Sequence, residues 1–182
     1  MIARARWIPL GLAEPLELRA AYTGLAEAQH RGAAPILLWA QAKFDILLGL
    51  ARARERHYVL ALIVPRHLAP GRRARWRAWA LAPVLAAYRQ FGLHAYLSGE
   101  EIRLGGRRIA ESGAGVIGEC VVAASGVLAA FPRRELEAVL RARVEAQHGW
   151  QFETSWPTAA ERAAILGARA ALAVPRAEAI AP

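Results

Sequence analysis

The sequence predicts an α+β domain in which helices cover a mixed or largely antiparallel sheet. Three observations lead to this fold class. The chain has 182 residues, of which 55% are hydrophobic and 21% charged, so it suits one domain with its own apolar core. Its expected helices and strands follow one another in mixed order rather than in regular β–α alternation. Its best strand-like apolar run, residues 58–65, is far too short for a membrane-spanning helix, so we expect no membrane segment.

The N-terminal part is expected to begin with a short strand, residues 6–8, followed by a helix. Pro15 fits the first turn of that helix, the acidic Glu14 favours its N-terminus, and Gly32 is expected to end it. Three strands should follow, at residues 36–39, 46–48 and 58–64, and the last is the clearest buried strand of the chain.

Residues 72–90 predict a second helix, because Trp76, Trp79 and Phe91 roughly share a face at helical spacing. Pro83 should kink this helix or divide it in two. The remaining elements are expected in this order: short strands at 94–97, 101–104 and 107–110, a small-residue loop at 112–115, a central strand at 119–130, a helix through 136–144 that ends at Gly149, and a last helix that starts at a capping box of Thr158 and Glu161.

Neither an internal repeat nor a linker divides the chain. We therefore expect one domain, residues 1–174, and a flexible tail at 175–182. The N-terminus carries positive charge with no apolar block behind it, which predicts a cytoplasmic protein without a signal peptide.

The chain is strongly basic, with a net charge of +9 that is almost entirely arginine, since Lys43 is the only lysine. Arginine is the better side chain for binding phosphate and carboxylate groups. An acidic protein, a nucleotide or a nucleic acid would each satisfy this charge, and a solvated basic surface is an equally open interpretation. The single cysteine, Cys120, excludes an internal disulfide, and no Cys and His spacing predicts a metal site.

The most informative stretch spans residues 97–132. Its centre reads Gly105-Gly-Arg-Arg-Ile-Ala-Glu-Ser-Gly-Ala-Gly115, and an apolar strand ending in Phe-Pro follows. This stretch resembles the lipoate-protein ligase A family, in which a β-hairpin carries Gly-Lys-Lys-Ile-Ala-Gly-Ser-Gly or Gly-Ser-Ala. Residues 35–49, 58–65 and 157–161 resemble other segments of that family in the same order.

The resemblance implies the fold of the biotin/lipoate ligase catalytic domain. It also implies lipoate or octanoate as the acyl substrate, either activated with ATP or delivered by a carrier protein, and transfer to a lysine of an acidic lipoyl-domain protein. Arg108 takes the place of the family lysine that neutralises developing negative charge on the acyl or phosphate oxygens. The positions expected to bind the substrate beside it are Arg107, Ser112, Gly113, Ala114 and Gly115.

Three departures from the family pattern motivate an alternative. Arg108 replaces lysine, and Glu111 replaces a glycine, which places a carboxylate where an acyl phosphate would lie. Residues 50–57, where the family has a glycine-rich loop, hold three arginines and no glycine: Arg52, Arg54 and Arg56. The alternative is therefore a catalytically degenerate homologue that binds a lipoyl-domain protein or a sister ligase subunit. A nucleic-acid-binding module is a third hypothesis that rests on charge alone, and we do not expect nucleic acid as the partner.

Other reactive residue types have simpler interpretations. Cys120 lies in an apolar run, which indicates an inert core thiol rather than an acyl-carrying nucleophile. His57 and His94 have no recognisable partner and are interpreted as strand-edge or surface residues.

The start of the second helix carries several cations. They are Arg72, Arg73, Arg75 and Arg77. A helix N-terminus disfavours positive charge, so these side chains are either simply solvated, which we favour, or they face an acidic partner. The tryptophans nearby are interpreted as core residues rather than as a stacking surface for bases.

Overall fold

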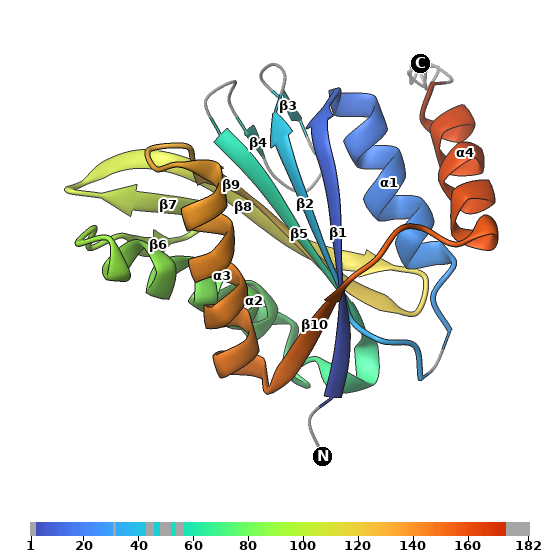
Figure 1. Ribbon diagram of the computed structural model, residues 1–182, viewed down its shortest axis with the longest axis horizontal. Coiled ribbons are helices and arrows are strands. Elements are labelled where there is room, and N and C mark those ends of the chain that lie inside the picture. The colour runs from blue at the N-terminus through green and yellow to red at the C-terminus, as the bar shows by residue number, and fades with distance from the viewer. Residues whose placement is uncertain (1–2, 31, 43–45, 48–51, 54–56, 174–182) are drawn as a thin grey trace, which may run out of the picture.

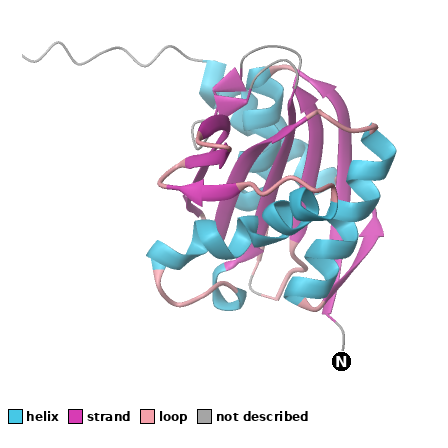
Figure 2. Cartoon of the chain, turned by 90° about the vertical axis from the view of Figure 1, so that its left-hand side faces the viewer, coloured by secondary structure: helices cyan, strands magenta, loops and turns pink. Residues whose placement is uncertain are grey.

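The computed structural model describes residues 3–30, 32–42, 46–47, 52–53 and 57–173. It confirms the predicted α+β class, with a mixed sheet that has helices on both faces (Figure 1). Helices α1 and α4 lie side by side on one face, and α2 and α3 lie together on the other, as Figure 1 and the turned view of Figure 2 show. The helices are α1 (Pro15–Glu27), α2 (Arg73–Gln90), α3 (Arg133–His148) and α4 (Ala159–Ala173), with a short 3-10 turn η1 (Arg66–Leu68) before α2.

Within the described residues, eight strands form one sheet in the order β10-β1-β2-β5-β9-β8-β7-β6. β1 runs parallel to both β10 and β2, and every other pair is antiparallel. The strands are β1 (Ala3–Ala13), β2 (Ile36–Ala42), β5 (His57–Pro65), β6 (Tyr96–Ser98), β7 (Glu101–Leu104), β8 (Arg107–Ile117), β9 (Cys120–Leu128) and β10 (Trp150–Thr154). A separate two-stranded sheet holds β3 (Ile46–Leu47) and β4 (Arg52–Ala53).

The core has two layers because the central strands are buried on both faces. Along β5, Leu60 and Leu62 pack toward α2 and α3, whereas Ala61 and Ile63 pack toward α1. Alternating side chains of a strand point to opposite faces, so a strand covered on both sides needs apolar residues at every position. This explains why β5 and most of β9 read as continuous apolar runs rather than as alternating patterns.

The structure differs from several predicted boundaries. The first helix ends at Glu27, and Gly32 instead lies in the following turn with a positive φ of 100°. Pro83 does not divide α2, which continues through it to Gln90. The strand predicted at residues 46–48 corresponds to β3, outside the main sheet. β10 was missed, because its five residues are buried only at every second position and carry few apolar side chains. The predicted tail at 175–182 lies outside the described residues.

The predicted capping box at the start of α4 is present and also holds the fold together. The backbone N–H of Thr158 donates to Oε2 of Glu161 at 2.7 Å, and the N–H of Glu161 donates to Oγ1 of Thr158 at 3.2 Å. The guanidinium of Arg6, in β1, forms an ion pair with the same buried carboxylate. Arg6 also donates to the Trp156 carbonyl at 2.9 Å. This pairing fixes the start of α4 to β1, although the two residues are 155 positions apart in the chain.

No helix of the described part of the chain is long and apolar enough to cross a membrane.

The contact between α1 and α4 gives a first prediction. A Cβ built on Gly24 would lie 2.4 Å from the backbone nitrogen of Ile165, so Gly24→Ala should force the two helices apart and lower the free energy of unfolding by about 2 kcal/mol. The control is Gly167→Ala, on the open side of α4 with no atom within 4 Å of its Cβ, which should stabilise the protein by up to about 1 kcal/mol. Urea unfolding of both variants tests this, and equal stabilities would contradict it.

The Arg6–Glu161 pair gives a second prediction. Burial raises the pKa of Glu161, but hydrogen bonds from Arg6 and Thr158 and the charge of Arg6 outweigh it, so the net pKa is lowered. A depressed carboxyl pKa stabilises the fold above the ordinary carboxyl pKa, and that contribution is lost as the pH falls through the lowered value. Glu161→Gln should therefore destabilise the protein by about 3 kcal/mol at neutral pH and by progressively less in acid.

Its control is Glu153→Gln, which removes an exposed ion pair with Arg4 at 3.5 Å and should change stability by less than about 0.5 kcal/mol. A stability difference between wild type and Glu161→Gln that is the same at all pH values would show that the carboxylate charge is irrelevant.

Candidate functional site

The hairpin of β7 and β8 places the predicted cations at one end of the sheet. Gly105 and Gly106 form its turn with φ values of 54° and 78°, a left-handed conformation that glycine adopts at little cost. β8 starts immediately after the turn, so Arg107 and Arg108 both lie at the exposed end of the hairpin. The predicted hairpin is thereby confirmed, and its basic end points away from the core.

Arg108 is not an isolated cation. Its Nη1 lies 2.6 Å from Oε1 of Glu111 and 3.6 Å from Oε1 of Glu101. The other oxygen of Glu101 accepts from Arg103, with Nη2 and Oε2 2.6 Å apart. Two arginines and two glutamates therefore alternate along one end of the hairpin. The positive charge of Arg108 is largely compensated within the protein before any anionic ligand arrives.

The small-residue segment 112–115 is not a loop, which corrects that prediction. It lies inside β8, where Ser112 pairs with Ser125 of β9 and Gly115 pairs with Val122. Small residues predict loops when they are exposed, but here they form a strand because the neighbouring strand and the layers around it supply all the burial. Ser112 is 1% exposed, and its hydroxyl donates to the Glu100 carbonyl at 3.1 Å. That carbonyl also accepts from the Ser112 N–H at 2.7 Å.

Two glycines of β8 leave part of the sheet without side chains. Gly113 and Gly115 lie opposite Ala124 and Val122, which belong to the core layer that faces α1. Directly paired residues point to the same face of a sheet, so this face carries no side chain at two successive β8 positions and a methyl group at Ala124. We call Gly113, Gly115 and Ala124 the small-residue strip. β4 contacts both β8 and β9, the two strands that form it.

His57 is a residue beside the hairpin that sequence reasoning placed wrongly. It begins the central strand β5, is 7% exposed, and its Nε2 lies 2.5 Å from the carbonyl oxygen of Ile109. Its Nδ1 is buried without a hydrogen-bond partner among the described residues. No sequence signal distinguished it from His94, which is exposed as predicted.

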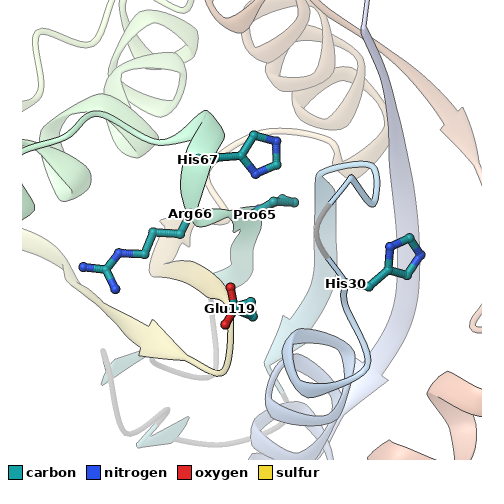
Figure 3. Close-up of a pocket in the computed structure, with 5 residues that line it drawn as sticks. All are labelled: His30, Pro65, Arg66, His67 and Glu119. Atoms are coloured by element: carbon teal, nitrogen blue, oxygen red, sulfur yellow. The ribbon is translucent and has the colours of Figure 1, made fainter.

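A pocket lies at the opposite end of β5 from the hairpin. It has a volume of about 290 Å³ and is lined by His30, Pro65, Arg66, His67 and Glu119. Pro65 ends β5, and the Arg66 N–H donates to the Glu119 carbonyl at 2.9 Å, which joins η1 to the turn between β8 and β9. Figure 3 shows the Arg66 side chain directed away from the other four residues. None of the residues predicted as a site lines this pocket.

The described residues contain no group of three or more side chains that could hold a metal ion. The charged side chains of the described hairpin are Arg103, Arg107, Arg108, Glu101 and Glu111. Of the three arginines that stand where the family has a glycine-rich loop, Arg52 lies in β4, and Arg54 and Arg56 lie outside the described part of the chain.

No protein-family model matches the chain, and no curated protein matches it by sequence. Solved structures do match it. One match is a structure from a study of the bi-partite lipoate protein ligase of Thermoplasma acidophilum and its E2 lipoyl domain. It superimposes with a TM-score of 0.76 at 10% identity, and the match covers 92% of each chain. A lipoate-protein ligase A bound with ATP gives a TM-score of 0.75 at 11% identity, covering 92% of this chain and 94% of that chain.

A further T. acidophilum structure, assigned as a lipoate protein ligase with bound lipoic acid, gives a TM-score of 0.71 at 11% identity over 90% of this chain and 94% of that one. At such low identities the likeness concerns the fold. The chain has the fold of the lipoate-protein ligases, which confirms the fold that the hairpin sequence implied.

The thiol of Cys120 gives a third prediction. Burial, together with the nearby charge of Glu119, raises its pKa to about 11. Since the thiolate is the reactive form, only about one thousandth of this thiol is ionised at pH 8. The native protein should therefore react with a disulfide reagent such as DTNB only as fast as it unfolds, and urea-unfolded protein should react at once. Rapid reaction of the native protein would contradict the inert interpretation of Cys120.

Proposed function

We propose that this protein binds a lipoyl or octanoyl group and transfers it to a lysine of an acidic lipoyl-domain protein. The observation that carries the proposal is the position of the small-residue strip directly after a basic hairpin, in a chain with the lipoate-protein ligase fold. Structures of that fold have been solved with ATP, with lipoic acid and in a system with an E2 lipoyl domain, which supports the same ligand classes here.

In this proposal the acyl group lies against the small-residue strip, where the buried Gly113 and Gly115 have no side chains to fill the space beside the sheet. Ser112 holds the β6–β7 turn against β8 through its two hydrogen bonds to Glu100. Arg107 and Arg108 lie at the polar end, near the acyl carbonyl. The lysine amine attacks the carbonyl carbon, a C–N bond forms, the bond to AMP or to the carrier sulfur breaks, and the amine proton leaves with the released group.

A second candidate function is binding without transfer, and the ion pair of Arg108 with Glu111 favours it. Glu111 lies 2.6 Å from the Arg108 guanidinium and so neutralises the positive charge that an acyl oxygen would otherwise meet. A homologue of this kind would recognise a lipoyl-domain protein or a sister ligase subunit while leaving the chemistry to another chain.

One experiment separates the two functions. The protein is incubated with an apo lipoyl domain, with octanoate or lipoate plus ATP in one reaction and with an octanoyl carrier protein in the other, and the mass of the lipoyl domain is measured. An increase by one acyl group establishes transfer and identifies the donor. An unchanged mass together with a stable complex on a sizing column establishes the binding function instead.

The role of Arg108 gives a fourth prediction. If it neutralises the acyl or phosphate oxygen, Arg108→Gln should slow transfer by about 100-fold, as expected for removing one stabilising charge from a transition state. The matched control is Arg89→Gln, since Arg89 is exposed near the end of α2 and forms no ion pair among the described residues; its rate should equal that of wild type. Transfer by Arg108→Gln at the wild-type rate would remove Arg108 from the mechanism.

A further inference from the structure

A compact group of cations covers η1 and the first turn of α2. Its members are Arg66, His67, Arg72, Arg73 and Arg75, which are all exposed and lie within ten residues of one another. We call these five residues the basic patch. It lies on the surface where β5 leaves the sheet, next to the pocket that Arg66 and His67 help to line.

The arginines of the basic patch are uncompensated. Among the described residues none of these four has a carboxylate within ion-pair distance, whereas Arg77, one turn further along α2, pairs with Glu100 at 3.3 Å. The sequence around them explains why. Residues 57–99 contain six arginines and not one Asp or Glu, although the whole chain has 15 acidic residues. The net charge of +9 is therefore distributed unevenly and is concentrated in this segment.

This arrangement does not stabilise the fold. The N-terminus of a helix carries partial positive charge, so cations in the first turn of α2 are unfavourable there. Arg72 occupies the N-cap position without a side-chain hydrogen bond to the helix, where Ser, Thr, Asp or Asn would stabilise the helix. The local sequence thus favours charge at the expense of helix stability, which points to a role in binding.

The backbone that displays the patch is held rigidly. The indole N–H of buried Trp76 donates to the Pro70 carbonyl at 2.6 Å, which ties the loop before α2 to the helix. The N–H of Ala69 donates to the Arg66 carbonyl at 3.3 Å. A surface that is ordered before binding loses less conformational entropy when a partner docks.

Leu68 adds an apolar contact to the patch. It is 42% exposed and lies in η1 directly after Arg66 and His67. An apolar residue surrounded by polar and charged ones is typical of protein interfaces. Binding to single-stranded nucleic acid instead uses exposed aromatic rings for base stacking, and the patch has none because Trp76 is buried.

We propose that the basic patch is the docking surface for an acidic protein, and that Leu68 makes an apolar contact within this interface. The identity of that protein rests on the proposed function: it is the acidic lipoyl-domain protein that receives the acyl group. Docking through this surface is separate from the chemistry at the hairpin, so the two can be tested independently.

The fifth prediction concerns Arg73→Glu/Arg75→Glu. Glutamates in the first turn of α2 interact favourably with the partial positive charge of the helix N-terminus. This variant should therefore unfold at the same temperature as wild type or at a higher one. Its affinity for an apo lipoyl domain, measured by calorimetry without any acyl donor, should fall by about tenfold or more, and the wild-type affinity should weaken as salt is added. The control Arg134→Glu/Arg169→Glu reverses two equally exposed arginines on α3 and α4 and should bind as wild type does.

Three results would overturn the proposal: no binding of the lipoyl domain to wild type, equal affinity for wild type and Arg73→Glu/Arg75→Glu, or tighter binding of an RNA or DNA oligonucleotide than of the lipoyl domain to the same patch. Failure of acyl transfer alone would leave the binding result standing, since the affinity is measured without a donor. A lipoyl domain that is acylated normally by the patch variant at saturating concentration would place the patch in docking and not in catalysis.

Discussion

The central strands β5 and β9 impose the main constraint on this structure, because both of their faces must be covered. Leu60 and Leu62 need the layer of α2 and α3, and Ala61 and Ile63 need α1. α4 is added behind α1 and secured by Arg6 and Glu161, a contact between the two ends of the chain. Because helices cover both faces of the central strands, exposed groups that could bind a ligand or partner lie at the ends of the strands. The hairpin, the pocket and the basic patch all lie there.

The hairpin carries arginines that could bind an anionic ligand, and it also carries glutamates that pair with one of them. In the proposed function, the glycines of the turn and of β8 would let an acyl group approach the sheet, and the arginines beside them would supply charge for an acyl or phosphate oxygen. Glu111 and Glu101, however, bind Arg108 directly. A ligand that needs Arg108 must compete with two carboxylates. An anionic acyl phosphate would be repelled by these carboxylates, whereas a neutral thioester carbonyl would be repelled much less. The glutamates around Arg108 would therefore affect which acyl donor is used as well as the activity.

The sequence predicted what local patterns determine. The continuous apolar run of β5, the glycine turn of the hairpin and the capping box of Thr158 and Glu161 are all encoded within a few residues. The small residues of segment 112–115 predict a loop, because their burial depends on pairing with β9 and on the layers around it, which composition alone does not show. The pocket and the partners of His57 and Arg108 likewise require contacts between separate strands or turns. The pairing of arginines with carboxylates could not be predicted for the same reason. Composition gives the net charge of the chain, and only the fold shows which arginines form ion pairs.

Glu100 contacts both α2, which carries the basic patch, and β8, which carries two glycines of the small-residue strip. Its side chain accepts from Arg77, one turn beyond the basic patch on α2, and its backbone carbonyl accepts both the N–H and the hydroxyl of Ser112 in β8. The contact with Arg77 is a surface ion pair, since the Glu100 side chain is 79% exposed, whereas Ser112 binds the Glu100 backbone directly. In the proposed function, a protein docked on the patch near Pro65 would have to reach the hairpin near His57, at the other end of β5, because acyl transfer depends strongly on the position of the reacting groups.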